Sequence, residues 1–207
     1  MIKLLTFLIS IIPFQKLKIL LLKLVGIKIS GKCYFGIFVI FSSKKNEIIN
    51  STIESFNIIS AEDIFIKKTI IKKWNYIKNL KKLELDEALI GNYNKFISDK
   101  KHQINENTLI IRSSEVYNHN LFDLTSNILI EKAKIYNFNQ FWTHGFNVFR
   151  KINLGDIEVK NNVVINNNVI ILPGVKILND VNLSHGTVVH KNIDVSGNYK
   201  SNLICKT

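Results

Sequence analysis

The stretch that decides the fold is IEVKNNVVINNNVIILPGVKILNDVNLSHGTVVHKNIDV, residues 157–195. Apolar residues stand there in pairs two positions apart, and each pair returns after six residues, with Thr187 as the polar exception. An α-helix would space its apolar residues three and four apart, and a plain amphipathic strand would alternate without polar interruptions. The period of six therefore predicts a parallel β-helix, in which each hexad supplies one short strand and one corner. The inward pairs are Ile157/Val159, Val163/Ile165, Val169/Ile171, Val175/Ile177, Val181/Leu183, Thr187/Val189 and Ile193/Val195.

Asn, Asp and Gly fill the positions between these pairs. Asn tolerates left-handed backbone angles better than other non-glycine residues, so it suits the corners of a coil. An ordinary sandwich of short strands is the alternative, but its turns would not recur at one interval through seven units.

Composition limits the class of protein and of partner. The 207 residues suffice for one sizeable domain with a small appendage. A formal charge of +12 favours an anionic partner, whether a phosphorylated cofactor, a nucleotide-linked substrate, nucleic acid or an acidic membrane face. The lysines are scattered and form no stripe with aromatic residues, which argues against nucleic acid. Cys33 and Cys205 are too few for a disulfide framework, so we expect a reducing, cytoplasmic compartment.

Residues 1–27 are strongly apolar but carry four lysines. No small-residue cleavage site follows, and Pro13, Gln15 and the lysines interrupt the run of about twenty apolar residues that a membrane span needs. We expect two short helices broken at Pro13. The second, residues 14–25, is a basic amphipathic segment that either lies on anionic lipid at the inner membrane face or packs against the sheet or a neighbouring subunit.

Residues 28–207 are expected to form the β-helix domain. In its first half only one apolar column recurs at six, so the prediction of early coils rests on fewer positions. The lysine-rich residues 91–103 are expected to form a corner loop or an insertion. The column consists of Ile53, Ile59, Phe65, Ile71, Ile77, Leu83 and Leu89, and then of Ile104, Ile110, Val116, Phe122 and Ile128.

The segment NFNQFWTHGFNVFRKINLGD, residues 137–156, has no six-residue period and is rich in aromatic residues. Side chains within the coils are committed to stacking, so only an excursion from them is free to project toward a ligand. We therefore expect the chemistry of the protein to reside in this loop.

The hexads, above all ILPGV at residues 171–175 and TVVHKNI at residues 187–193, resemble those of the hexapeptide-repeat acyltransferases. The residues IPFQKLKILLLKLVGIKISGKCYFG at 12–36, FDLT at 122–125 and FWTHG at 141–145 are similar to segments of polysaccharide O-acetyltransferases in that group. The resemblance implies a left-handed coil, a homotrimer and acetyl-coenzyme A as acyl donor. The sequence departs from the family's pattern at two places, one expected to contact the edge of the cofactor and one expected to cap the C-terminal end. Val164 stands where the family usually has Trp, and the proline-rich ending is missing.

The resemblance also implies site residues. His144 matches the histidine that serves as general base toward an acceptor hydroxyl, and a neutral imidazole suits that role because its ordinary pKa lies near neutrality. Asp123 either sets the tautomer of His144 or binds the acceptor, unless it only caps a corner. Trp142 is an acceptor-stacking surface or a loop anchor, and it is grouped with Thr143 as candidate substrate-binding residues.

For coenzyme A, the matching positions lie at the outer corners of the last coils, where lysines would meet the phosphates as point charges. No metal is expected. The implied activity is O-acetylation of a sugar hydroxyl on a glycan acceptor, nucleotide- or lipid-linked, in cell-surface polysaccharide synthesis, and N-acetylation of an amino sugar would use the same base. The candidate coenzyme A residues are Asn167, His185, His190, Lys191 and Lys206.

Two alternatives belong to other classes. The γ-class carbonic anhydrases share the β-helix and bind zinc through three histidines, and His144, His185 and His190 have comparable spacing. The acyltransferase-like TVVHKN and FWTHG segments argue against zinc. The chain could also be a non-enzymatic scaffold or binding solenoid, a reading that rests on its charge alone.

Overall fold

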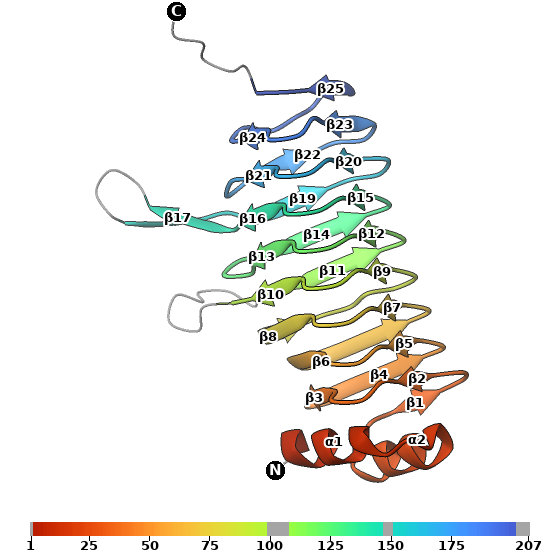
Figure 1. Ribbon diagram of the computed structural model, residues 1–207. Coiled ribbons are helices and arrows are strands. Elements are labelled where there is room, and N and C mark those ends of the chain that lie inside the picture. The colour runs from red at the N-terminus through yellow and green to blue at the C-terminus, as the bar shows by residue number, and fades with distance from the viewer. Residues whose placement is uncertain (1, 99–107, 147–150, 202–207) are drawn as a thin grey trace, which may run out of the picture.

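The computed structural model describes residues 2–98, 108–146 and 151–201. The chain winds into one stack of coils, each built from three short parallel strands (Figure 1). Two helices, α1 (Ile2–Ile11) and α2 (Gln15–Leu24), lie across the N-terminal end of the stack. This confirms the predicted parallel β-helix with short N-terminal helices, while its left hand stays a prediction from the resemblance.

The strands form three faces that follow one another around each coil. Near the N-terminus, the long strands β6 and β8 run from the first face into the second without a break, so these two faces form one sheet there. The strand β3 pairs with the first-face part of β6, and β4 pairs with its second-face part. The first face holds β3 (Ile40–Ser42), β6 (Ile58–Lys67), β8 (Tyr76–Lys82), β10 (Lys95–Ile97), β13 (Leu121–Asp123), β16 (Gln140–Trp142), β21 (Ile170–Ile171) and β24 (Val188–Val189). The second holds β1 (Ile29–Ser30), β4 (Lys45–Ile49), β11 (Leu109–Arg112), β14 (Ile128–Glu131), β19 (Ile157–Val159) and β22 (Lys176–Ile177). The third holds β2 (Tyr34–Phe35), β5 (Thr52–Ile53), β7 (Ile70–Ile71), β9 (Leu89–Ile90), β12 (Glu115–Val116), β15 (Lys134–Ile135), β20 (Val164–Ile165), β23 (Val181–Leu183) and β25 (Gly197–Tyr199).

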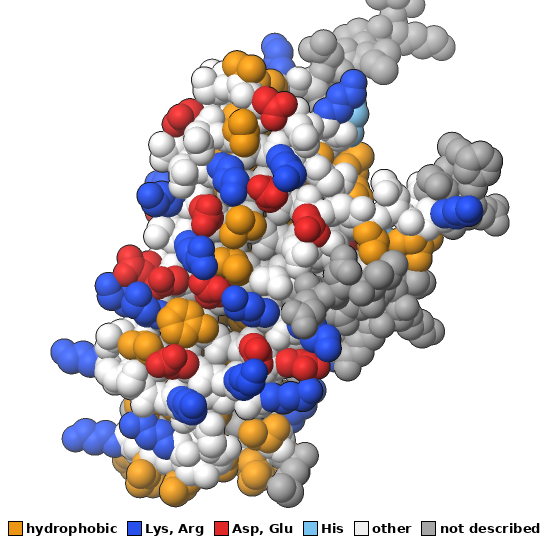
Figure 2. Space-filling model, turned by 180° about the vertical axis from the view of Figure 1, so that it is seen from behind, with side chains coloured by type: hydrophobic (Ala, Val, Ile, Leu, Met, Phe, Trp, Pro, Cys, Tyr) orange, Lys and Arg blue, Asp and Glu red, His pale blue; other side chains and the backbone are white. Residues whose placement is uncertain are grey.

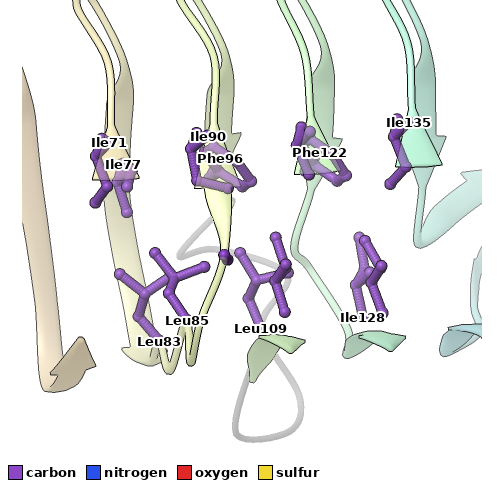
Figure 3. Packing of buried hydrophobic residues seen from close by; sticks show 14 of the residues in the cluster. Ile71, Ile77, Leu83, Leu85, Ile90, Phe96, Leu109, Phe122, Ile128 and Ile135 are labelled. Atoms are coloured by element: carbon purple, nitrogen blue, oxygen red, sulfur yellow. The ribbon is translucent and has the colours of Figure 1, made fainter. Parts of the chain in front are cut away.

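The core is a set of side-chain columns that run along the stack, because parallel strands in register place equivalent residues one above another. Figure 3 shows such residues meeting inside the coil. On the first face, the ring of Phe122 stacks on Phe96 at 4.6 Å and on Phe141 at 4.5 Å. Every predicted inward residue of the decisive hexads is buried except Val195, which is 67% exposed. On the third face the buried column runs Ile53, Ile71, Ile90, Val116, Ile135, Ile165, Leu183.

The early coils exist as predicted, but the six-residue column loses register within them. Phe65 is only half-buried, and Ile64 and Ile66 on either side of it point inward instead. The pairing of β6 with β8 is also irregular here, because the register shifts between Ile59 and Ala61. Similar displacements bury Ile90 in place of Leu89, and Leu109 and Ile111 in place of Ile110; Ile104 lies outside the described residues.

One corner of the coil carries a column of aromatic side chains where Asn, Asp or Gly was expected. Two residues before each first-face strand, the backbone has positive φ, and in the early and middle coils the residue is aromatic. Their rings stack on one another; Phe56 and Trp74, for example, have centroids 4.2 Å apart. In the last coils, where the hexads predicted Asn, Asp or Gly, this corner is occupied by Asn168 and Gly186. The column consists of Phe38, Phe56, Trp74, Tyr93, His119 and Phe138.

Helix α1 covers the open edge of the first coil with polar side chains. The Thr6 hydroxyl donates to the carbonyl of Phe41 at 2.9 Å and accepts the Phe41 N–H at 3.1 Å. The Ser10 hydroxyl accepts the Val39 N–H at 3.1 Å. These bonds replace those that a preceding coil would make, so the sheet edge presents no unpaired strand here.

Helix α2 continues this cap with Lys18, whose side chain is fully buried. Its Nζ donates to the carbonyls of Phe35 at 2.9 Å and Gly36 at 3.0 Å. Burial lowers the pKa of this ammonium, since desolvation disfavours the charged form. The Gln15 amide pairs with the N–H and carbonyl of Phe35. None of the helices in the described ranges has the length and hydropathy to cross a bilayer.

Candidate active site

Within the described ranges 108–146 and 151–201, the chain leaves the coil once, directly after β16. The strands β17 (His144–Phe146) and β18 (Ile152–Leu154) form an antiparallel hairpin that projects from the side of the stack (Figure 1). The excursion is therefore shorter than the predicted 137–156. Residues 137–142 still belong to the coil, because Phe141 pairs with Phe122 on one side and with Ile171 on the other.

The hairpin returns to the coil against the corner formed by Pro173 and Gly174 of the ILPG segment. Gly155 is required there by close approach, because a Cβ atom on it would lie 2.3 Å from the backbone nitrogen of Gly174. Gly145 is less confined, since its Cβ would meet the Pro173 ring at an ordinary 3.6 Å. The corner after the first face thus fixes the position of the hairpin.

His144, at the start of the hairpin, forms a dyad with Asp123 of the preceding coil. Its Nδ1 lies 2.7 Å from Oδ2 of Asp123, and the carboxylate side chain is only 7% exposed. A carboxylate only accepts, so Nδ1 carries a proton, and in the neutral imidazole Nε2 keeps its lone pair. The imidazole is 26% exposed, and Nε2 has no hydrogen-bond partner among the described residues. The arrangement leaves one basic nitrogen available to a ligand.

Two threonines hold the carboxylate of Asp123. The Thr125 hydroxyl donates to Oδ1 at 2.8 Å, and the backbone N–H of Thr143 donates to Oδ2 at 3.1 Å. The Thr143 hydroxyl lies 3.0 Å from the same Oδ2 and accepts the Ser126 N–H at 2.9 Å. Thr143 is fully buried by these contacts, so it positions Asp123, and its expected role in binding substrate does not fit.

Asp156 anchors the second foot of the hairpin, which is the end at residues 154–156 where the chain returns to the coil. Its carboxylate accepts hydrogen bonds from the Ser126 hydroxyl and from the backbone N–H of Asn127 at 3.0 Å. Desolvation raises the pKa of Asp156, but the hydrogen bonds from Ser126 and Asn127 and the charge of Lys176 outweigh it, so the net pKa lies below the ordinary value. Neither Asp156 nor Thr125 was identified from sequence, although each lies within a short polar segment, FDLT or LGD.

Two aromatic side chains flank the imidazole. Trp142 meets the His144 ring edge-on at 6.0 Å between centroids, and Phe146 does so from the other side at 6.2 Å. Phe146 is 68% exposed, whereas the indole N–H of Trp142 is tied to Gln140 at 3.0 Å. Phe146 is therefore the more open of the two surfaces beside the imidazole.

The candidate coenzyme A residues separate into two groups. His190 and Lys191 follow β24 at the same corner as the dyad, two coils further along the stack, because Phe141 aligns with Ile171 and Ile171 with Val189. They line a hollow of about 530 Å³ at the C-terminal end.

Asn167 and His185 instead lie at the opposite corner, the one that carries the aromatic column. Asn167 donates its N–H to Nδ1 of His185 at 3.3 Å and accepts from Asn137, so both are part of a ladder of coil-to-coil hydrogen bonds. The structure does not bring this pair together with His144. Lys206 lies outside the described residues.

The three histidines of the zinc alternative do not meet within the chain. Among the described residues, no three His, Cys, Asp or Glu side chains form a group that could hold a metal ion. Nδ1 of His185 is already occupied by the backbone of Asn167, and His144 is paired with Asp123.

Comparisons with known proteins reach this chain only through solved structures. No protein-family model and no curated protein matches it. The polySia-specific acetyltransferase NeuO is 16% identical over 81% of this chain and 78% of its own, with a TM-score of 0.41. The UDP-N-acetylglucosamine acyltransferase from Campylobacter jejuni is 12% identical over 80% and 68%, at 0.45. The maltose O-acetyltransferase from Clostridium difficile 630 is 14% identical over 92% and 74%, at 0.35. These identities and TM-scores are too low to assign chemistry, which has to be argued from the site.

Proposed function

We propose that this protein is an acyltransferase that moves an acetyl group from acetyl-coenzyme A to a hydroxyl of a sugar, with His144 as general base. The observation that carries the proposal is the 2.7 Å contact between Nδ1 of His144 and Asp123, which in the neutral imidazole places the proton on Nδ1 and the lone pair on Nε2. A buried carboxylate that fixes the tautomer of a partly exposed imidazole is an arrangement suited to general-base catalysis.

The dyad would perform both proton transfers of the reaction. Nε2 takes the proton of the acceptor hydroxyl while its oxygen attacks the thioester carbonyl, and the resulting imidazolium is stabilised by Asp123. Collapse of the tetrahedral intermediate breaks the carbon–sulfur bond, and Nε2 returns its proton to the leaving thiolate. The products are an acetyl ester and free coenzyme A, and the enzyme ends in its starting protonation state.

The donor side of the proposal rests on the corner above the dyad. Lys191 and Lys200 both line the C-terminal hollow, where exposed ammonium groups can meet phosphates. The hollow opens two coils from His144, at a rise of roughly 10 Å for coils about 4.8 Å apart. A donor with a nucleotide at one end and a thioester at the other would span that interval.

The acceptor side rests on the similarity of FDLT and FWTHG to polysaccharide O-acetyltransferases and on the exposed ring of Phe146 beside the base. We propose a glycan acceptor, a homotrimeric assembly and a cytoplasmic location on the same resemblance. None of these three assignments is needed for the dyad to act as a base.

The test compares two histidines of the same chain. His144→Asn removes the base, and we expect thiol release from acetyl-coenzyme A in the presence of glycan acceptors to fall by at least about 100-fold. His119→Asn is the matched control, because it removes an imidazole from the aromatic column and Asn tolerates the positive φ of 59° found there. Equal rates for His144→Asn and the wild type would remove His144 from the mechanism.

A further inference from the structure

The two N-terminal helices bury polar side chains and expose most of their large apolar ones. A surface helix ordinarily buries its apolar stripe, yet here the buried residues include Thr6, Ser10 and Lys18, beside Ile9 and Leu22. Of the nineteen large hydrophobic residues that are exposed in the described chain, eight lie on these two helices or between them. They are Leu4, Leu5, Leu8, Ile11, Phe14, Leu17, Leu20 and Leu24.

The orientation of the two helices is fixed by the end of the coil that they cover. The end of a coil offers backbone N–H and carbonyl groups, and the polar side chains of α1 and α2 are bonded to them. Rotating either helix to bury its leucines would leave these backbone groups buried without partners, which is costly. The apolar face therefore remains on the outside of the folded chain, and Figure 2 shows apolar side chains gathered at this end.

The charged residues of this part of the chain have one sign. Residues 1–46 contain eight lysines and no Asp or Glu. Lys3, Lys16, Lys23, Lys28 and Lys32 are exposed, and none of them has an ion pair within the described ranges. By contrast, Lys44 and Lys45 already pair with Glu62 and Asp63 of the coil.

We propose that the outward face of α1 and α2 docks on an anionic phospholipid surface, with the leucines entering the acyl boundary and the lysines meeting the headgroup phosphates. Two helices lying flat across one end give the geometry of an interfacial amphipathic pair. A second copy of the chain is a poorer occupant, because the apolar faces could meet only by bringing two all-lysine rims together. The proposal does not depend on acyl transfer.

The experiment measures co-sedimentation of the full-length protein with vesicles of phosphatidylcholine alone or with about one quarter phosphatidylglycerol, at low and high salt. We expect binding to the anionic vesicles to be at least about tenfold tighter than to the neutral ones and to weaken with salt. Leu8→Ser/Leu20→Ser and Lys16→Glu/Lys23→Glu should each lose most of the binding. Val195→Ser and Lys95→Glu, which change exposed residues on the coil, should bind as the wild type does.

Thermal unfolding checks that each variant keeps the fold, and the lipid comparison on unaltered protein does not depend on any variant. Equal partitioning onto neutral and anionic vesicles would overturn the proposal, as would undiminished binding by Lys16→Glu/Lys23→Glu. Sedimentation of a concentration-dependent dimer that Leu8→Ser/Leu20→Ser dissolves, without vesicle binding, would assign the face to a second copy instead.

Discussion

At the scale of single residues, the aromatic column explains how bulky side chains occupy corners that require positive φ. The left-handed conformation costs a non-glycine residue about 1–2 kcal/mol, and a stacked aromatic pair returns about 0.5–1.5 kcal/mol. The flanking Asn side chains add hydrogen bonds between coils; Asn94, for example, accepts the Asn120 N–H at 2.9 Å. The repeated triplets are NYN at 92–94, NHN at 118–120 and NFN at 137–139.

Trp74 separates stacking from backbone strain. It stacks on Phe56 at 4.2 Å and on Tyr93 at 6.3 Å with φ of 63°. Trp74→Ala loses the stacking and keeps the strain, so we expect it to lower the free energy of unfolding by about 1–3 kcal/mol. Trp74→Gly should recover about 1 kcal/mol of that loss, because Gly adopts positive φ freely. Urea denaturation checks the order, and a glycine variant less stable than the alanine variant would contradict it.

The hexads indicated the corners correctly for Asn162, Asn168 and Asp180, because tolerance of positive φ is a property of the residue itself. They could not indicate Phe56 or Trp74, whose tolerance depends on a stacking partner in the next coil. The same limit applied at the candidate site. The motifs named Asp123 and His144 as candidates, but the burial of Thr143 depends on contacts between coils.

At the scale of elements, the hairpin and the ILPG corner act as one unit. Proline and glycine at 173–174 do more than turn the chain, because Gly155 packs directly on Gly174 and the returning strand is aligned by that contact. His144 pairs with Leu154 across the hairpin, so a shift of the chain at residues 154–156 would also shift His144.

Gly155→Ala tests this alignment. The new methyl group would stand 2.3 Å from backbone nitrogen, so the foot must shift, and we expect thioester turnover to fall at least about tenfold because a small misplacement of a base is costly. Gly145→Ala is the control within the same hairpin, since its methyl group meets only the Pro173 ring at 3.6 Å. Both variants should keep the thermal unfolding of the coil. Turnover by Gly155→Ala equal to that of Gly145→Ala would show that this end of the hairpin does not determine the position of His144.

At the scale of the whole molecule, charges of both signs alternate along one side of the stack (Figure 2). Glu84 is the most enclosed carboxylate of this array, 13% exposed, with Arg112 at 2.7 Å and Lys82 at 3.2 Å. Desolvation raises its pKa, but the hydrogen bonds and charges of Arg112 and Lys82 prevail and lower the net pKa below the ordinary 4.5. A carboxylate with a depressed folded pKa stabilises the fold above its unfolded pKa and loses that contribution as pH falls through the folded value.

Glu84→Gln should therefore lower the stability by about 1–3 kcal/mol at neutral pH, because Arg112 is left without its main partner. The difference from the wild type should shrink below pH 4.5 and vanish in stronger acid. Denaturant unfolding at a series of pH values checks this. Glu87→Gln, which breaks an exposed pair with Lys68, should show a much smaller difference, and a pH-independent effect of Glu84→Gln would contradict the argument.

The architecture as a whole was predictable because stacked coils of similar size require apolar residues at a constant spacing, most clearly in residues 157–195. The orientation of the N-terminal helices was not. Their amphipathic pattern left two alternatives open, contact with lipid or packing against the sheet or a neighbouring subunit. The surface beneath them is a sheet edge, which selects Thr6 and Lys18. Only the three-dimensional arrangement shows that most of the leucines point away from the coil.

The regular rise of the coil makes the protein a spacer of defined length. Five coil steps separate β3, beside the helices, from β16, which leads into His144. At about 4.8 Å a step, His144 stands roughly 24 Å from the end of the stack. If the helices rest on lipid, as proposed, lipid headgroups could not reach His144 at that distance. Only a lipid-linked glycan long enough to span it could, so the number of coils would determine which sugar unit is modified.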